Sequence, residues 1–313
     1  MSQLSMSASV STSVVTPASA TEVEPAYIET VIRPRKGWIG IDWAELLSRR
    51  ELLFFLIWRD VKVKYKQAIF GSAWAIVVPL VSVIIYSVVG ILAGFANRTV
   101  EGVPYPVYVY AGLLPWLFLQ AAINGGGMSL VNNQALLTKI YLPRLFIPTS
   151  MIGSAMVDMF FSSLVFIGML LFFWVKTHGQ FVPSWQVVFV PPLLLLLVIA
   201  ATGTAYLLSA LTVMFRDLRF IIPFITQLGI WLTAVVYPQT LFIFKHKDGT
   251  VSDYRNWLAL NPFAGIIHSF RAAILGEPWN FIQLGSSIVL CCVLFVLGLF
   301  YFKRVERRFA DIA

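Results

Sequence analysis

Charged residues are scarce in this chain. Of its 313 residues, 12% are charged and 58% are hydrophobic, whereas soluble domains have about 25% charged residues and about 45–50% apolar ones. A soluble fold of this length could not shield so much apolar surface from water, so part of its surroundings must be lipid. The composition predicts an integral membrane protein. It excludes a secreted disulfide scaffold, a cytosolic enzyme or a disordered tail protein as the class of the whole chain.

The sequence also lacks the motifs of catalysis, nucleotide binding and metal binding. Its two cysteines, Cys291 and Cys292, are adjacent in an apolar run. Adjacent residues point about 100° apart on a helix, so we expect neither a bridge between them nor a metal site. The chain has no P-loop, no His-Glu-x-x-His and no Gly-x-Ser-x-Gly. We therefore interpret it as a protein that is not an enzyme and holds no cofactor.

The N-terminal region divides into an extension and a basic, partly apolar segment. Residues 1–30 are rich in Ser, Thr and Ala and contain no Lys or Arg, so they lack the basic start of a secretory signal. We predict a disordered cytoplasmic extension over 1–35. Asp42 followed by Glu45 resembles a capping box and predicts a helix start. The apolar run at 52–58 is too short to cross a bilayer, so it predicts an amphipathic interfacial helix and a basic collar over 36–66.

Six apolar runs further along are long enough to cross a bilayer of about 30 Å. They cover about 70–95, 106–125, 145–175, 184–213, 221–244 and 283–302. The predicted fold class is all-α integral membrane, with a six-span domain over 67–305 and a cytoplasmic tail at 306–313. Between the last two spans, the half-apolar segment 245–282 favours short re-entrant helices. An exposed loop that carries an amphipathic helix is the alternative.

The basic residues indicate the orientation of the spans. With both termini in the cytoplasm, the inner segments hold 17 of the 23 Lys and Arg residues and the outer segments hold six. Cytoplasmic loops carry an excess of these residues, so both termini are predicted to be cytoplasmic. We read the net charge of +8 as a topology signal and expect no nucleic-acid partner.

Asp158 is the acidic residue that we place within a predicted span. A carboxylate at this depth is costly and indicates function by default. The alternative is a structural carboxylate that is hydrogen-bonded to Ser or Thr of a neighbouring helix or that faces water in a cavity. Ion-coupled transporters need more intramembrane polar groups than this chain offers, so coupling to protons or sodium has weak support.

Four short segments, in this order, resemble those of a known family. They are the basic stretch from Arg59 through Gly71 and Trp74 to Pro79-Leu80, the segment 139–145, the segment 215–219, and Asn261-Pro262-Phe263 with Arg271. In a six-span chain with a preceding interfacial helix, they resemble the permeases of type-2 ABC transporters that export polysaccharides. These permeases are the membrane subunits for O-antigen, capsule and teichoic acid export. The resemblance covers about residues 40–310.

The resemblance implies a homodimer in which each copy docks one separate P-loop ATPase subunit that binds ATP and Mg. The helix at 132–144 would be the coupling helix that sits in a cleft of the ATPase, supported by the helix at 42–58. Its apolar stripe suits a partner surface, or alternatively packs on the protein's own spans. The predicted ATPase-coupling residues are Leu136, Leu137, Lys139, Ile140, Tyr141, Pro143, Arg144, Arg216, Asp217 and Arg219.

Further site residues follow from the expected substrate. A sugar polymer needs a wide path with flat faces, and aromatic side chains offer such faces. If the polymer rides on a lipid diphosphate, cations near the inner leaflet would pair with its phosphate oxygens. The predicted channel-lining residues are Tyr86, Trp231 and Asp158; the predicted lipid-diphosphate contacts are Arg59, Lys62, Lys64 and Lys66; and the predicted outer gate comprises Asn261, Pro262, Phe263 and Arg271.

The sequence thus predicts the permease subunit of an ATP-driven exporter that moves lipid-linked polysaccharide, with O-antigen as the preferred cargo, across the inner membrane of a bacterium. The expected partners are a second copy, two P-loop ATPase subunits, the lipid-linked glycan and membrane lipids. One alternative is an ABC permease for a drug or other lipid. Others are a membrane-embedded glycan-processing protein and a secondary transporter that uses Asp158.

Overall fold

The computed structural model describes most of the chain, and the described part is predominantly helical. Described are residues 8–13, 29–34, 43–66, 71–99, 102–139, 142–178, 184–245 and 251–306. Five helices are long and apolar enough to cross a membrane, which confirms an all-α membrane protein. They are α3 (Trp74–Leu92), α4 (Tyr105–Asn132), α6 (Phe146–Lys176), α7 (Val190–Met214, preceded by a 3-10 turn at Trp185–Phe189) and α10 (Phe281–Glu306).

These five helices match five of the six predicted runs, but the fifth run, at 221–244, folds differently. Its helix, α8 (Leu218–Leu232), has 15 residues and stops about halfway through the run. Thr233 Oγ1 donates to Gly229 O, 2.7 Å away, and Val235 N donates to Ile230 O, 3.2 Å away. This pattern closes a helix, as in a Schellman turn. Hydropathy registers the apolar run but not the point where the backbone turns.

The remaining elements are short. They are β1 (Ala8–Ser13), β2 (Glu29–Pro34), α1 (Trp43–Ser48), α2 (Arg50–Lys66), α5 (Gln134–Lys139), β3 (Ile243–Lys245), β4 (Val251–Asp253), α9 (Ala264–Leu275) and 3-10 turns at Gly71–Ala73, Ala96–Arg98, Gln239–Phe242 and Arg255–Leu260. In the extension that we expected to be disordered, β1 pairs antiparallel with β2, from Ala8 opposite Pro34 to Ser13 opposite Glu29. β3 pairs antiparallel with β4. The Asp42 of the predicted capping box lies outside the described residues.

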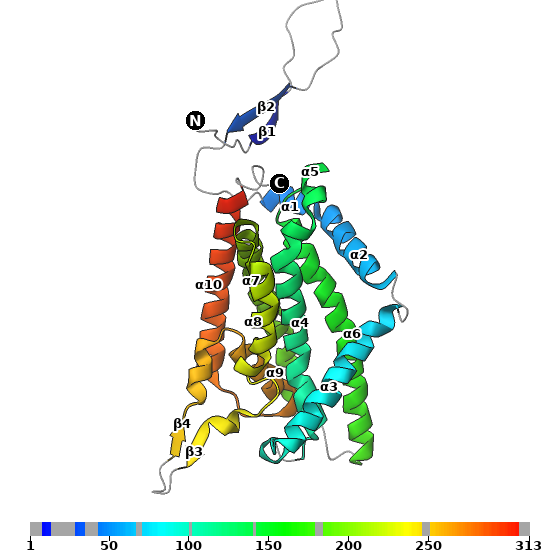
Figure 1. Ribbon diagram of the computed structural model, residues 1–313, viewed down its shortest axis with the longest axis vertical. Helices are drawn as coiled ribbons and strands as arrows, with labels where there is room; N and C mark the ends of the chain where they lie inside the picture. The colour runs from blue at the N-terminus through cyan, green and yellow to red at the C-terminus, as the bar shows by residue number, and fades with distance from the viewer. Residues whose placement is uncertain are drawn as a thin grey trace, which may run out of the picture.

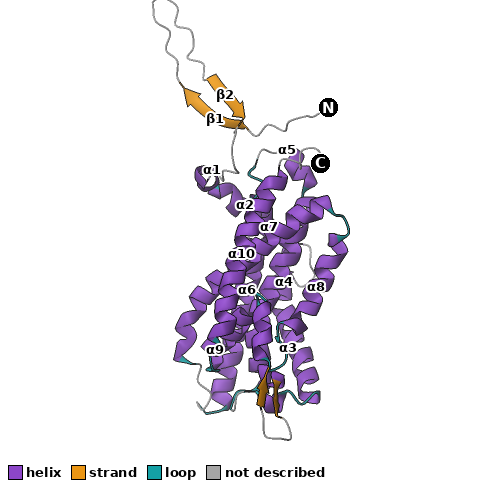
Figure 2. Ribbon diagram, turned by 90° about the vertical axis from the view of Figure 1, so that its left-hand side faces the viewer, coloured by secondary structure: helices purple, strands orange, loops and turns teal. Residues whose placement is uncertain are grey.

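The bundle has two distinct ends (Figure 1). α1, α5, the α7–α8 turn and the last turn of α10 lie at one end, which we call the α5 end. α9 and the β3–β4 pair lie at the opposite end, which we call the α9 end, and Figure 2 shows the same separation from the side. α2 begins at the α5 end and packs along α6.

Helix α4 is the centre of the core. It contacts α3, α6, α7, α8 and α9. In its most apolar window, 78% of the residues are buried, against 17–28% in the other four long helices. α4 is the least apolar of the five long helices, so it is the one that gains most from protein neighbours in place of lipid, which agrees with this central place. The outer helices leave their apolar faces exposed, as lipid contact requires.

Helices α7 and α10 approach each other closely at two glycines. A Cβ on Gly298 would lie 2.1 Å from Gly203 O, and a Cβ on Gly203 would lie 2.5 Å from Phe295 N and Cα. Small residues of this kind let two helix backbones touch within a membrane, where dispersion contacts replace the hydrophobic effect.

We predict that Gly298→Ala lowers the stability of the protein by about 1–3 kcal/mol, because the added methyl group must separate the two backbones. The measurement is the midpoint of thermal unfolding in detergent. Gly285→Ala is the matched control on the same helix, because no atom lies within 4 Å of a Cβ at that position. Equal unfolding midpoints for the two variants would contradict the close contact.

Candidate functional site

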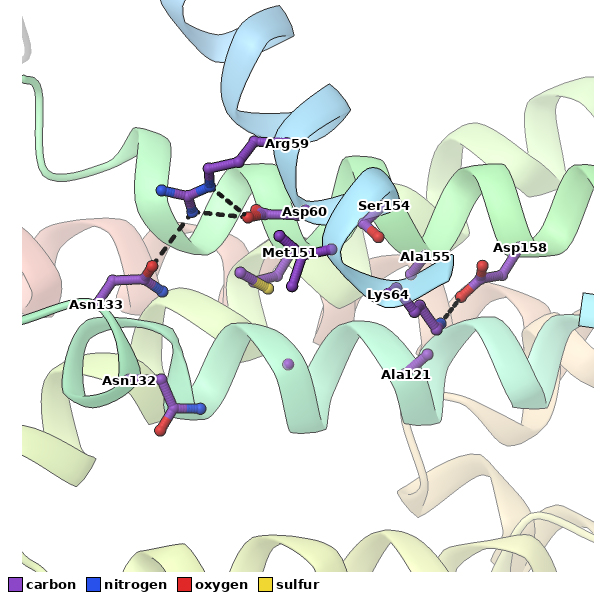
Figure 3. Close-up of a pocket in the computed structure, with 12 residues that line it drawn as sticks. Arg59, Asp60, Lys64, Ala121, Asn132, Asn133, Met151, Ser154, Ala155 and Asp158 are labelled. Carbon is purple, nitrogen blue, oxygen red and sulfur yellow. Dashed lines mark hydrogen bonds and ion pairs between the residues drawn. The ribbon is translucent and has the colours of Figure 1, made fainter. Parts of the chain in front are cut away.

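A cavity of about 430 Å³ lies between α2, α4 and α6. Its described lining includes two cations, Arg59 and Lys64, and two carboxylates, Asp60 and Asp158. Figure 3 shows the cations and Asp60 on α2 and Asp158 facing them from α6. Among the predicted site residues, the structure therefore brings two of the lipid-diphosphate contacts together with Asp158, which we had assigned to the channel.

Arg59 connects α2 to the junction between α4 and α5. Its Nε and Nη2 donate to Asp60 Oδ1 over 2.9 and 2.6 Å, and Nη2 also donates to Asn133 Oδ1 over 3.2 Å. Asp60 Oδ2 accepts from Ser150 Oγ of α6, 2.8 Å away. One ion pair thus links three parts of the chain.

Asp158 is neutralised from outside its own helix. Its carboxylate accepts hydrogen bonds from Lys64 Nζ and Tyr65 Oη, both on α2. Burial, and then the hydrogen bond to Asp158, raise the pKa of Tyr65, so this hydroxyl stays protonated and remains a donor. The carboxylate that stood alone in the sequence is therefore half of an ion pair between α2 and α6.

The other two predicted diphosphate contacts are separate from the cavity. Lys62 and Lys66 are exposed on α2 and do not belong to the described lining. Lys62 Nζ lies 5.1 Å above the centre of the Trp58 ring, at a distance typical of a cation–π contact. The four predicted cations thus form two sets. Arg59 and Lys64 line the cavity and pair with carboxylates, whereas Lys62 and Lys66 lie outside the described lining.

The two aromatic residues predicted to line the channel meet each other. The rings of Tyr86 on α3 and Trp231 on α8 are 6.3 Å apart and nearly perpendicular, an edge-to-face pair. Trp231 keeps 41% of its surface exposed. Their pairing shows that α3 and α8 approach each other here and leave an aromatic face uncovered.

The predicted outer-gate residues converge on the end of α8. Asn261 Nδ2 donates to Leu232 O over 3.2 Å, and Asn261 Oδ1 accepts from Phe263 N over 3.0 Å. Pro262 O accepts from Cys291 Sγ of α10, 3.4 Å away. The turn at 261–263 is thereby fastened to both α8 and α10.

Arg271, on α9, makes several contacts at this end, and only 1% of its surface is exposed. Nη1 donates to Ala234 O over 2.9 Å and to Tyr108 Oη over 3.0 Å, and Nη2 donates to Val235 O. The guanidinium lies 4.2 Å above the Tyr108 ring. A Cβ on Gly112 would be 2.3 Å from Nη2, so glycine leaves the space that the guanidinium fills.

The Arg271 contacts also hold a strained residue. Ala234 has a φ of 51°, in the left-handed region that costs an L-residue about 1–2 kcal/mol. Such a conformation persists where its surroundings determine it, and Arg271 binds the carbonyls of Ala234 and Val235. The sequence placed Arg271 in the outer gate but gave no signal for its contacts with Tyr108 or for the space at Gly112.

A buried His268–Glu277 pair lies beside Arg271 and was not found from the sequence. His268 Nε2 is 3.2 Å from Pro278 O, which can only accept, so this nitrogen carries the proton. Nδ1 lies 3.5 Å from Glu277 Oε2. Burial, and then the charge of Arg271, lower the pKa of His268 to about 4, whereas burial raises the pKa of Glu277.

The described members of the predicted coupling set lie at the α5 end and differ in their surroundings. Leu137 packs against the core cluster that contains Leu130 and Leu145, so part of the α5 stripe is packed on the protein's own helices. Leu136 is half-buried, Lys139 ends α5, and Ile140 and Tyr141 lie outside the described residues.

Pro143 and Arg144 join the coupling segment to the long helices. Pro143 O accepts from Phe146 N over 2.9 Å at the start of α6, and Arg144 Nη1 donates to Glu306 O at the end of α10. Three further predicted coupling residues are exposed on the α7–α8 turn. These are Arg216, Asp217 and Arg219.

Comparison with known proteins finds similarity to permeases and transport proteins of polysaccharide export. It is 28% identical over 231 residues, 73% of this chain and 82% of the relative, to the O-antigen export system permease protein RfbA of Myxococcus xanthus. It is 26% identical to the protein of the same name from Klebsiella pneumoniae, over 84% of this chain and 95% of the relative. It is 20% identical to the polysialic acid transport protein KpsM of Escherichia coli, over 80% and 92%.

No protein-family model matches the chain. The curated relatives nevertheless confirm the resemblance that the four sequence segments predicted, to permeases of polysaccharide export. They also agree with a transport subunit rather than an enzyme.

We predict that Arg271→Met strongly destabilises the α9 end, because the carbonyls of Ala234 and Val235 and the Tyr108 hydroxyl lose a charged donor, at about 1–3 kcal/mol for each buried group. Hydrogen–deuterium exchange at 233–236 should accelerate and the unfolding midpoint should fall. Arg255→Met is the control, because its ion pair with Asp253 is partly exposed to solvent and surface pairs contribute little. Equal effects of the two substitutions would disprove the role of Arg271.

The His268 environment predicts an acid-sensitive contribution to stability. The pKa of His268 is about 4 in the folded protein, below the ordinary 6.5, so the unfolded chain binds a proton that the folded protein does not. This contribution is fully present above about pH 6.5 and is lost as the pH falls toward 4.

The measurement is the unfolding midpoint of wild type and His268→Gln between about pH 7 and about pH 5. Because Glu277 is present in both proteins and its raised pKa acts in the opposite direction, the difference between the two isolates His268. The wild-type midpoint should fall more steeply. Parallel profiles would show that His268 is not held neutral.

Proposed function

We propose that this chain is the membrane permease subunit of an ATP-driven exporter that carries lipid-linked polysaccharide, with O-antigen as the cargo, across the bacterial inner membrane. The observation that carries the proposal is similarity to O-antigen export permeases over 84% of the chain, together with the apolar helices. The missing P-loop fits a subunit that leaves ATP and Mg to a separate ATPase chain.

The proposed topology has six spans with both termini in the cytoplasm. α8 runs from the α5 end toward the α9 end (Figure 1). In the proposed topology, the turn at 233–237 and the 3-10 turn after it would complete this crossing. With α8 counted, α1 and the end of α10 belong on the same side of the membrane, as an even number of crossings requires. The excess of Lys and Arg at the α5 end supports the cytoplasm as that side.

The α9 helix is proposed as a re-entrant element of the outer gate. All 12 of its residues are buried, although it is too short to cross a membrane. Short helices at membrane depth are tolerated where protein surrounds them, and α4, α7 and α10 surround α9.

In the proposed mechanism, each copy of a homodimer receives one ATPase subunit at the α5 end. α5 and the exposed residues Arg216, Asp217 and Arg219 form the docking surface. ATP binding by the partner moves α5, and rigid-body motion of the two permease copies opens a path for the glycan. Trp231, which is exposed and packs edge-to-face on the half-buried Tyr86, offers sugar rings a flat face along this path.

Native mass spectrometry of the tagged protein, extracted gently from its own host, tests this assembly. We expect two copies of this chain with two P-loop ATPase subunits. Replacing Arg216 and Arg219 with Glu should reduce ATPase retention, because both residues lie on the docking surface. Arg255→Glu, at the opposite end, should leave it unchanged.

Two results would contradict the proposal in different ways. If repeated mild extraction yields an oligomer of this chain without any ATPase subunit, the proposal of an ATP-driven exporter is wrong. If wild type contains the intact assembly but deletion of this chain leaves the surface polysaccharide unchanged, the result would instead point to a permease for a drug or another lipid.

A further inference from the structure

The cavity between α2, α4 and α6 has no net formal charge in its described lining. Arg59 and Lys64 contribute two positive charges, and Asp60 and Asp158 contribute two negative ones. A diphosphate therefore gains little long-range attraction from the cavity as it stands, although two of its cations were predicted to bind that group. To bind an anion tightly, at least one cation must leave its carboxylate.

The exposure of the four side chains gives the anion a route. Lys64 is 49% exposed and its partner Asp158 is 20% exposed; Arg59 is 29% exposed and Asp60 is 9% exposed. In each pair the cation faces outward and the carboxylate lies behind it. An arriving phosphate would therefore meet the cations first.

Arg59 can bind an anion without leaving Asp60. A guanidinium has five N–H donors, and the bonds to Asp60 and Asn133 use Nε and Nη2. Nη1 points away from both partners in Figure 3. Asp60 is also held by Ser150, so this pair stays in place when an anion binds.

Lys64 differs because its charge is carried by a flexible ammonium group that Asp158 already neutralises. An anion that draws this ammonium group toward itself therefore competes with Asp158 for its charge. If Lys64 leaves, Asp158 still accepts the hydrogen bond from Tyr65 Oη. The carboxylate is then not stranded without a donor, which lowers the cost of the exchange.

We propose that Asp158 is a competing ligand for Lys64, so that a diphosphate group binds in the cavity by taking Lys64 from Asp158 and adding a contact from Arg59. Asp158 thereby sets the affinity of the cavity for diphosphate. The inference rests on the proposed function in one respect. It takes from that function the source of the diphosphate, the headgroup of a lipid carrier.

The competition makes two substitutions act in opposite directions. Asp158→Asn frees Lys64 and gives the described lining a net charge of about +1, so diphosphate binds more tightly. Tyr65→Phe removes the second donor of Asp158 but keeps its charge, so the carboxylate depends on Lys64 and diphosphate binds more weakly. A cavity for an uncharged sugar would show neither change.

The test uses the full chain in nanodiscs of zwitterionic lipid and isothermal titration with inorganic pyrophosphate and with farnesyl diphosphate. We expect Asp158→Asn to raise diphosphate affinity about tenfold, and Lys64→Gln in that background to abolish the gain. Arg50→Gln is the matched control, because Arg50 is exposed on the same helix and belongs neither to the described cavity lining nor to the predicted diphosphate contacts. Binding of farnesyl diphosphate alone identifies a lipid headgroup as the ligand, and equal binding of both probes identifies free diphosphate.

Unchanged or weaker diphosphate binding by Asp158→Asn would overturn the proposal, as would an Arg50→Gln effect equal to that of Lys64→Gln. If Asp158→Asn does not fold, Tyr65→Phe decides, since it keeps the ion pair and unchanged or tighter binding would contradict the competition. These titrations involve neither ATPase docking nor export. Their failure alongside an intact two-plus-two assembly would therefore reject this inference and leave the proposed function standing.

Discussion

The backbone groups that are freed where α8 stops must be satisfied inside the protein, because lipid offers them no hydrogen bonds. Arg271 meets this requirement from α9. It binds the carbonyls of Ala234 and Val235, stacks on Tyr108 of the central helix and occupies the space left by Gly112. The strained turn, the buried short helix and the core helix at the α9 end thus depend on one another through a single guanidinium.

Charged side chains must also find partners inside the protein, and the ion pairs around the cavity between α2, α4 and α6 meet this requirement. A carboxylate in a long apolar helix is tolerated where a cation reaches it. Lys64 does this for Asp158 from α2, and Arg59 does it for Asp60 while also holding Asn133 next to α5. The position of α2 against α6 is therefore fixed by polar contacts as well as by Leu56, which is buried. Asn133, which Arg59 contacts, directly precedes α5, the helix proposed to receive the ATPase.

Hydropathy and motif order predicted the membrane class, five long helices and the relatives, because these properties are carried by long runs of residues. They could not predict where α8 ends, since the end depends on a hydrogen-bonded turn and on Arg271, which is 36 residues further along the chain than Val235. Asp158 was singled out in the sequence and assigned to the channel, but its ion-pair partner Lys64, 94 positions away, was not predicted. A pairing over such a separation has no local signature. For the same reason, the His268–Glu277 pair was missed, as neither residue stands in a motif.

The contact between Gly203 and Gly298 limits how the bundle can move. At these two glycines the backbones of α7 and α10 touch with no side chain between them, so we expect the two helices to move together. Deformation must then fall on helices with looser packing and an interrupted hydrogen-bond ladder. α3 and α8 meet this description, because each contains an internal proline, Pro79 and Pro223, and both are less buried than α4, which contains Pro115. These two helices also carry the Tyr86–Trp231 pair, so this pair lies on the helices best able to deform along the proposed export path.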